Sequence, residues 1–205
     1  MANKKLITAY QKLRPTERYM VQLCAFANRP LERRDLAQFL ASAGLTDSAG
    51  KRFTQTAIGQ IARKLEAASM LVRCSYDGMQ ADGEIADLVM QDSIRRGQFD
   101  ELRGIFEQPG SRYGSYRYDY SRLSRNLRIA FYAGEVSEFQ SFLKSFGHYK
   151  QVRLLDPFSA DIFATLDPVL QQWLFTNSIP RIILRPEGDD GLLAAFESWA
   201  AAQPE

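Results

Sequence analysis

The residue types that most often carry enzymatic or metal chemistry are scarce in this chain. Its 205 residues include one histidine, His148, and two cysteines, Cys24 and Cys74. Most metal sites and nucleophile–base pairs need histidine, and two cysteines form neither a zinc cluster nor a disulfide framework. An enzyme would have to work with carboxylates, lysine or tyrosine alone. We therefore expect no catalytic residue, metal or cofactor, and thiols that pack as small apolar groups in a reducing cytoplasm.

Two segments resemble ligand-binding motifs without meeting their chemical requirements. Residues 44–52 look like a phosphate-binding loop, but the spacing is one residue too long. Arg52 also stands where a magnesium-binding Ser or Thr is required. The acidic residues between positions 77 and 87 have neither the spacing of an EF-hand loop nor its final bidentate Glu. Neither segment predicts a site.

Charge is divided unevenly along the chain, although the formal net charge is only +2. Residues 1–75 hold thirteen Lys and Arg against five Asp and Glu, whereas residues 76–205 hold thirteen against nineteen. Such asymmetry suggests two modules with different partners, and the basic module is a candidate for binding nucleic acid. The alternative is an ordinary solvated surface. No run of apolar residues is long enough for a transmembrane helix, so we expect no membrane partner.

The basic half has the pattern of three short helices followed by a strand and a turn. Apolar residues recur at spacings of three and four, which predicts the helices. The expected helices cover residues 15–27, 32–43 and 54–68, the strand 70–75 and the hairpin turn 76–79. Pro15 suits a first helical position, Gly44 a left-handed helix end, and Thr54 an N-cap. These three residues mark helix ends at the positions that the apolar spacing also predicts.

This order of elements, over about residues 15–92, resembles a winged helix-turn-helix domain. The resemblance implies that the third helix lies in the major groove of DNA, where its exposed side chains reach base edges. Carried over position by position, the base contacts would come from Gln55, Thr56, Gln60 and Arg63. Gln can bind adenine, and Arg guanine, through two hydrogen bonds. Phosphate contacts, which set affinity and register, would come from Lys51, Arg52, Lys64, Arg33, Arg34 and Arg73.

The segment after the strand departs from a DNA-gripping wing, which is usually basic. It carries Asp77, Asp82, Glu84 and Asp87, and Asp82-Gly83 interrupts the expected return strand. These carboxylates would repel phosphates, so we do not expect the wing itself to touch DNA. Winged helices also serve as dimerisation or docking modules, and that alternative stays open.

The second half contains an internal repeat of helix, glycine turn and helix between about residues 87 and 146. When Gly97 is aligned with Gly134, the apolar positions of the flanking helices coincide. The period is close to that of tetratricopeptide-like helix pairs, and the resemblance is one of architecture. Stacking buries such faces, so we expect a helical-hairpin bundle. It serves either as a protein-binding surface or as a structural spacer.

The rest of the second half gives weaker signals. Residues 111–122 interleave Arg with Tyr, which suits either base stacking or the packing of rings on neighbouring helices. Apolar spacing predicts a helix over residues 160–176, divided near Pro168, and a last helix over residues 190–202. Residues 181–185 read as a short strand or as a turn of helix.

The sequence thus predicts a mainly α protein with a winged helix domain at residues 1–92 and a helical-hairpin domain at residues 93–205. The expected function is non-catalytic recognition of double-stranded DNA, coupled to a platform for a protein partner or for further domains of a larger chain. Module order and hairpins such as residues 127–134 are also similar to the N-terminal region of large bacterial helicase-like ATPases. The alternative is a protein-interaction or dimerisation module whose winged helix does not contact DNA.

Overall fold

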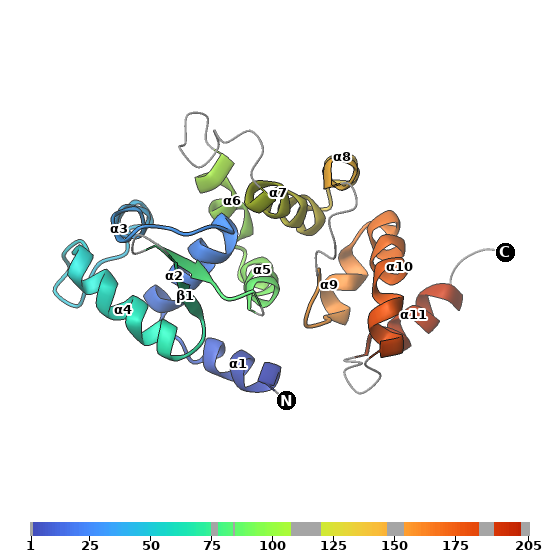
Figure 1. Cartoon of the computed structure of the whole chain (residues 1–205), viewed down its shortest axis with the longest axis horizontal. Coiled ribbons are helices and arrows are strands. Elements are labelled where there is room, and N and C mark those ends of the chain that lie inside the picture. Colours follow the sequence, from blue (N-terminus) through green and yellow to red (C-terminus); the bar gives the residue numbers. More distant parts are fainter. Residues whose placement is uncertain are drawn as a thin grey trace. The chain divides into compact units, whose positions relative to one another are not determined.

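The computed structural model describes residues 2–74, 78–83, 85–107, 120–146, 154–184 and 191–201. Within these residues the protein is mainly α, as predicted, and its one sheet has two strands (Figure 1). Contacts divide the chain into an N-terminal unit, residues 1–125, and a C-terminal unit, residues 126–205. None of the described helices is long and apolar enough to cross a membrane.

The element order agrees with the helices and the strand predicted for residues 15–75. The N-terminal unit contains α1 (Ala2–Gln11), α2 (Pro15–Ala27), α3 (Arg33–Ser42), α4 (Gln55–Ala67), β1 (Leu71–Arg73), β2 (Met79–Ala81), α5 (Ala86–Arg95) and α6 (Phe99–Glu107). The division between the units falls within α7 (Tyr120–Ala133). The C-terminal unit continues with α8 (Val136–Phe146), α9 (Ala160–Thr165), α10 (Pro168–Leu184) and α11 (Leu192–Ala201).

Local signals set the ends of the helices as predicted. Pro15 is the first residue of α2, and Asn28 ends that helix in the left-handed conformation, with φ of 48°. Gly44 follows α3 with φ of 69°, a value that glycine adopts without strain. The Thr54 side chain accepts a hydrogen bond from the Ala57 N–H at 3.2 Å and caps α4. Each of these devices acts within four residues of chain, which is why the sequence reveals them.

Helix α2 is the buried axis of the N-terminal unit and packs against α3, α5, α6 and β2. Met20, Leu23 and Phe26 are fully buried, and the Phe26 ring meets the Phe99 ring edge-on, with centroids 5.4 Å apart. Full burial of such a side chain stabilises a fold by about 1.5–3 kcal/mol. Cys24 is also fully buried, and burial, together with the charge of Cys74, raises the pKa of its thiol. This thiol is therefore an apolar packing group, as expected.

The sheet is small but regular. β1 runs antiparallel to β2, with Leu71 opposite Ala81 and Arg73 opposite Met79. Met79 also pairs with Leu31, which precedes α3, through two backbone hydrogen bonds of 2.8 Å. The predicted weakness of the return strand at Asp82-Gly83 does not prevent pairing, because β2 ends before Asp82.

Helices α5 and α6 belong to the N-terminal unit, so the division lies at 125/126 and not at 92/93. The Tyr19 hydroxyl donates to Glu101 at 2.8 Å, which ties α2 to α6. The rings of Phe39 and Phe106 meet edge-on at 5.6 Å, which ties α3 to α6. The apolar stripes of α5 and α6 are therefore covered by α2 and α3. The sequence pattern identified these stripes but not their partners.

Helix α1 was not predicted from the sequence. Its residue Tyr10 is buried, and the Tyr10 hydroxyl donates to Asp92 of α5 at 3.0 Å. The Arg18 guanidinium lies over the Tyr10 ring, 5.9 Å from its centroid. The contacts of Tyr10 thus tie this helix to α5 and to the start of α2.

Two aromatic clusters form the interior of the C-terminal unit. In the first, the Trp173 ring packs edge-on against Phe139 with a centroid distance of 4.9 Å, and Phe131 lies beside both. In the second, the Phe175 ring lies 4.9 Å from that of Phe163 and also 4.9 Å from that of Phe196 on α11. The predicted break near Pro168 is confirmed, and residues 181–184 are helical, being the end of α10.

Both glycines of the predicted repeat end a helix in the left-handed conformation. Gly97, between α5 and α6, has φ of 66°, and Gly134, between α7 and α8, has φ of 73°. The helix–glycine–helix pattern therefore occurs twice. The first copy packs on α2, however, and so does not open a separate domain. His148 and the Arg/Tyr segment up to residue 119 lie outside the described residues.

Candidate nucleic-acid interface

Helix α4 separates its residues into an apolar face and a polar face. Ile58, Ala62 and Leu65 are buried against the unit. The four residues expected to contact bases are all exposed on the opposite side, namely Gln55, Thr56, Gln60 and Arg63. They combine two amides, a hydroxyl and a guanidinium along one exposed helical surface. The structure therefore brings together the whole set that the resemblance implied.

Gly59 lies between these faces and is buried, although the sequence pattern placed it on the polar side. A Cβ atom at this position would lie 3.3 Å from Cζ of Arg33, a residue at the start of α3. The absence of a side chain at Gly59 thus lets the Arg33 guanidinium pack against α4. Arg33 is half-buried, whereas its neighbour Arg34 is exposed. Of these two predicted phosphate contacts, only Arg34 is fully at the surface.

Lys64 is held at the base of α4 by a buried carboxylate. Its Nζ lies 2.7 Å from Oε1 of Glu17, a residue that is 2% exposed, while Lys64 itself is 59% exposed. Arg14 donates to the same oxygen from Nη2 at 2.8 Å, and its backbone N–H donates to the other oxygen at 3.1 Å. Glu17 therefore joins the start of α2 to the end of α4.

The electrostatic environment keeps Glu17 ionised. Burial raises the pKa of its carboxyl, but hydrogen bonds from Arg14 and Lys64, together with the charge of Arg14, outweigh that effect and lower the pKa to about 2. A carboxylate that stays charged and buried must keep its cationic partners close. Lys64 is consequently a fixed cation, and part of its charge is already neutralised before any phosphate approaches.

The loop before α4 is ordered by Asp47. Its side-chain oxygen accepts hydrogen bonds from the backbone N–H groups of Ala49 and Lys51, both at 2.9 Å. The Asp47 N–H in turn donates to the Lys51 carbonyl at 2.8 Å. Lys51 and Arg52 are exposed at the end of this turn. Both predicted phosphate contacts thus precede the N-terminus of α4 in a defined backbone conformation.

Arg73 takes part in an ion pair on the surface. Its Nη2 lies 3.0 Å from a carboxylate oxygen of Glu66, and both side chains are more than one-third exposed. Such exposed pairs contribute about 0–1 kcal/mol, so the pair does not prevent Arg73 from turning toward a phosphate.

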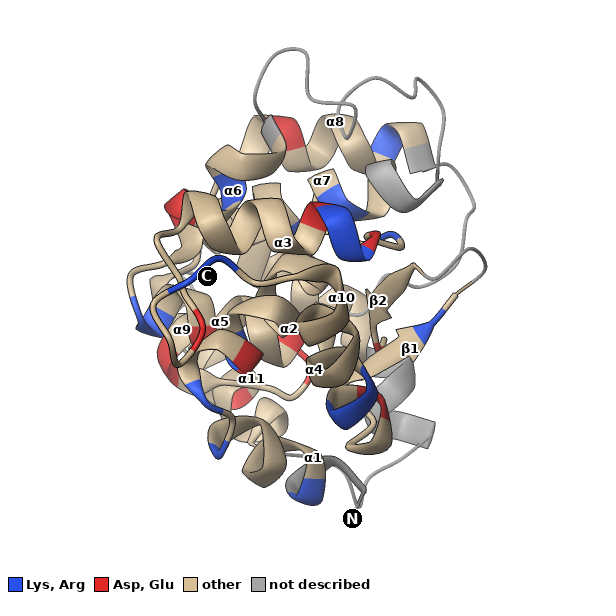
Figure 2. Ribbon diagram, turned by 90° about the vertical axis from the view of Figure 1, so that its left-hand side faces the viewer, with Lys and Arg blue, Asp and Glu red and all other residues tan. Residues whose placement is uncertain are grey.

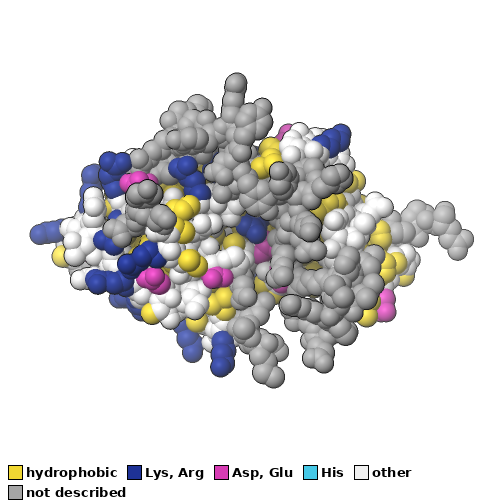
Figure 3. Space-filling model, viewed as in Figure 1, with side chains coloured by type: hydrophobic (Ala, Val, Ile, Leu, Met, Phe, Trp, Pro, Cys, Tyr) yellow, Lys and Arg dark blue, Asp and Glu magenta, His cyan; other side chains and the backbone are white. Residues whose placement is uncertain are grey.

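Basic side chains gather on one part of the N-terminal unit. In the space-filling view they are concentrated where Figure 1 shows α3 and α4 (Figure 3). The ribbon coloured by charge marks the Lys and Arg positions of α4 and β1 (Figure 2). The uneven charge of the sequence thus becomes a local concentration in the part of the N-terminal unit that holds α3 and α4.

The acidic residues expected on the wing do not act as one group. Asp87 lies in the first turn of α5 and is buried, so it is not part of an exposed acidic surface. Asp82 is half-buried, and its backbone N–H donates to the Met70 carbonyl at 3.1 Å. Asp77 and Glu84 lie outside the described residues. Asp87 is therefore not one of the exposed carboxylates that were expected to repel DNA phosphates.

Two contributors to this surface were missed in the sequence. Glu17 organises Lys64, and Gly59 makes room for Arg33. The first left a local signal, because Glu17 three residues after Arg14 has the spacing of a capping box around a Pro-initiated helix. The second left none, since nothing near Gly59 in the sequence indicates which side chain approaches it.

The chain matches no protein-family model, no curated protein and no solved structure. Among the described residues, no group of three or more histidine, cysteine, aspartate or glutamate side chains is placed to hold a metal ion. The functional argument therefore rests on the arrangement of α4 and its surroundings.

Proposed function

We propose that the N-terminal unit is a winged helix-turn-helix that binds double-stranded DNA, without catalysis, by placing α4 in the major groove. The observation that carries this proposal is the polar face of α4, where Gln55, Thr56, Gln60 and Arg63 are all exposed. An α-helix fits the major groove of B-DNA, and amide and guanidinium side chains are the groups that bind adenine and guanine there.

The order of the elements supports the proposal. Helices α2, α3 and α4 are followed by the antiparallel pair β1 and β2. Leu31, between α2 and α3, forms an isolated antiparallel bridge with Met79 on β2, which ties the start of α3 to the hairpin. In such domains the helix before the β-hairpin enters the groove. Here that helix is α4.

The charge around α4 also supports the proposal. Lys51 and Arg52 are exposed just before the helix, and Arg34 is exposed on α3. Contacts from such residues to phosphates fix the register of a protein on DNA but carry no sequence information. They would leave sequence discrimination to the polar face.

Fluorescence anisotropy of a labelled duplex of about 20 base pairs, roughly two helical turns, tests the proposal. We expect binding that weakens steeply between about 50 and 200 mM salt, because phosphate contacts release counterions. The preferred sequence can then be selected from a random duplex library. No binding at low salt would contradict DNA recognition by this chain.

Charge reversal at Arg63 distinguishes a specific contact in the major groove from nonspecific electrostatic attraction between the protein and DNA. Arg63→Glu should reduce affinity by about tenfold or more, the value of a lost base contact. Lys144→Glu is the matched control, because it reverses one exposed charge on α8. Reversal at Lys64 is less informative, since it would place a second carboxylate beside Glu17. Equal losses from Arg63→Glu and Lys144→Glu would point to nonspecific attraction.

A second candidate function is protein docking or dimerisation by the same unit without DNA. Val72 favours it, because this large apolar side chain is 46% exposed on β1. The ion pairs of Lys64 and Arg73 also leave fewer cations free for phosphates. Under this alternative, Val72→Thr would weaken self-association in analytical ultracentrifugation, and Arg63→Glu would have no effect.

For the C-terminal unit we propose a helical platform that binds a protein partner or further domains. Its paired helices around Gly134 and its aromatic interior suit a scaffold of this kind. A place in a larger helicase-like protein is compatible with this role. Pull-down of partners with residues 1–205 and with an Arg63→Glu chain would separate platform binding from DNA binding.

A further inference from the structure

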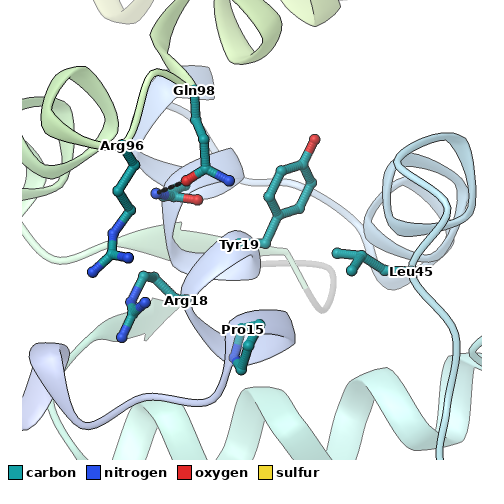
Figure 4. A pocket seen from close by; sticks show the side chains of 7 residues that line it. Pro15, Arg18, Tyr19, Leu45, Arg96 and Gln98 are labelled. Atoms are coloured by element: carbon teal, nitrogen blue, oxygen red, sulfur yellow. Dashed lines mark hydrogen bonds between the residues drawn. The ribbon is translucent and has the colours of Figure 1, made fainter.

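An open pocket of about 480 Å³ lies within the N-terminal unit, and no residue of α4 is among those that line it (Figure 4). Helix α2 supplies its centre with Arg18, Tyr19 and Gln22, and the turn between α5 and α6 supplies Arg96 and Gln98. Ligand pockets for small molecules commonly have volumes of about 300–1,000 Å³. The size of this pocket therefore suits a small ligand.

The walls of the pocket differ in character. Arg18 and Arg96 lie on one side, whereas Tyr19 and Leu45 lie on the other, with Pro15 at the edge (Figure 4). No aspartate or glutamate is among the residues that line it. The cationic and the apolar side chains thus line opposite sides of the pocket. This division predicts a ligand with an anionic group at one end and an apolar body at the other.

Contacts behind the walls hold the polar side chains in place. The Gln22 amide is buried and donates to Oε1 of Gln98 at 3.2 Å. Nη2 of Arg18 donates to the Gln11 carbonyl at 2.9 Å and to the Leu13 carbonyl at 3.1 Å. Nε of Arg96 donates to Asp92 at 2.8 Å. The two cations are thus oriented before any ligand enters, which lowers the entropic cost of binding.

Arg18 is half-buried, and its Nε has no hydrogen-bond partner among the described residues. That atom has almost no accessible surface, so a ligand in the pocket would meet the outer nitrogens of the guanidinium group. Arg96 is already paired with Asp92, but two neighbouring guanidinium groups still repel each other, and an anion beside them relieves that repulsion. This effect favours an oxyanion beside Arg18 and Arg96.

We propose that this pocket binds a small organic carboxylate with an apolar, ring-sized body. The carboxylate lies against Arg18 and Arg96, because planar guanidinium groups bind carboxylates through paired hydrogen bonds. The body packs against Tyr19, Leu45 and Pro15. This site does not depend on the DNA-binding proposal, since no residue of the polar face of α4 lines it.

Isothermal titration calorimetry of the full chain with three probes tests the proposal. Benzoate carries both the charge and the ring, benzamide carries the ring without the charge, and acetate carries the charge without the ring. We expect benzoate to bind about tenfold or more tightly than benzamide or acetate. Benzamide lacks the charge that the arginines would bind, and acetate lacks the ring that the apolar side chains would bury. Inorganic phosphate binding as tightly as benzoate would overturn the proposal, and so would the absence of saturable benzoate binding at millimolar concentrations.

Two variants assign the binding to the pocket. Arg96→Gln should weaken benzoate binding by about tenfold, the value of one charge-assisted hydrogen bond. Leu45→Gln should weaken benzoate binding and leave acetate binding unchanged, since it alters only the apolar wall. Lys5→Gln is the control, because it removes one exposed charge on α1 outside the pocket. Circular dichroism establishes that each variant is folded, and equal benzoate affinity in all three variants would place the ligand elsewhere.

Discussion

The two units of the protein are held together by different kinds of contact. In the N-terminal unit eight polar or charged described residues are buried, among them Glu17 and Gln22, whereas Ser159 is the one such residue described in the C-terminal unit. The C-terminal unit relies instead on rings, such as those around Phe175. Buried polar groups need specific partners, so they fix the orientation of surface side chains near them.

This contrast explains why the candidate sites lie in the N-terminal unit. Glu17 orients Lys64, and Gln22 helps to set the wall of the pocket. Aromatic clusters supply stability through area and ring geometry, without presenting charged groups in defined positions. Both proposed recognition sites therefore lie in the N-terminal unit, and the platform proposed for the C-terminal unit rests on its aromatic interior. The following substitutions test the difference, starting with the largest effect.

Phe175→Ala should destabilise the C-terminal unit by about 3–5 kcal/mol, the usual cost of removing a buried Phe. The ring is buried, with Phe163 and Phe196 both 4.9 Å away. Both tryptophans, Trp173 and Trp199, lie in this unit, so tryptophan fluorescence during urea unfolding reports on it alone.

Val169→Ala, on the same helix, is the control, because Val169 is 43% exposed. It should change stability by less than about 0.5 kcal/mol. Amide NMR signals from α2 to α4 should persist in Phe175→Ala. Their simultaneous loss would mean that the two units unfold as one and that the contrast does not extend to stability.

Glu17→Gln should destabilise the N-terminal unit by roughly 2–3 kcal/mol at neutral pH, since it removes the charge that Arg14 and Lys64 surround. The pKa of Glu17 is lowered to about 2 in the folded protein. A lowered pKa means that its stabilising effect is present above the unfolded pKa, near pH 4.5, and is lost as the pH falls toward 2.

Thermal unfolding followed by circular dichroism between neutral pH and pH 2 measures this effect. The wild-type melting temperature should fall over the acid range, and that of Glu17→Gln should fall less. Glu66→Gln is the control, since the exposed pair with Arg73 is worth less than about 1 kcal/mol. Identical acid profiles for the wild type and Glu17→Gln would show that Glu17 is not the titrating group.

Lys51→Gln should weaken duplex DNA binding similarly for all sequences and lower the salt slope by about 1, as expected for one lost phosphate contact. Lys64→Gln should lower the slope by less, because Glu17 already neutralises part of the Lys64 charge. Anisotropy titrations at several salt concentrations give both slopes. A larger effect of Lys64→Gln would show that the ion pair opens when DNA binds.

The features that could be predicted from the sequence depend on contacts within a few residues. Pro15, Gly44 and Thr54 act locally, and all three end or begin helices as predicted. Apolar spacing likewise located α10 and its start at Pro168. The exposed face of α4 followed from the same spacing, because the buried stripe determines which residues remain outside.

The features that were missed depend on residues far apart in the chain. Tyr10 can be buried because its hydroxyl donates a hydrogen bond to Asp92, a residue 82 positions away in the chain. The unit boundary was misplaced because α5 and α6 pack on α2, and α6 also meets α3 through Phe106, and periodicity does not identify such partners. Gly59 was assigned to the polar face because the sequence does not reveal that Arg33 lies over it.

Gly59 also gives the smallest predicted effect, in comparison with Gly104 on α6. Replacing an exposed helical Gly with Ala stabilises a helix by about 0.5–1 kcal/mol. At Gly104 nothing lies within 4 Å of a new Cβ, so Gly104→Ala should gain that full amount. At Gly59 the new Cβ would lie 3.3 Å from Arg33, which must shift, so Gly59→Ala should gain less.

Urea unfolding followed by circular dichroism compares the two variants, and DNA titration adds a second readout. Gly59→Ala should also reduce duplex affinity slightly, because it moves the Arg33 guanidinium off α4, whereas Gly104→Ala should leave affinity unchanged. If both variants gain the same stability and bind DNA equally, Arg33 adjusts freely, and its contact with α4 is packing without a role in recognition. An affinity loss confined to Gly59→Ala would instead identify Arg33 as part of the recognition surface.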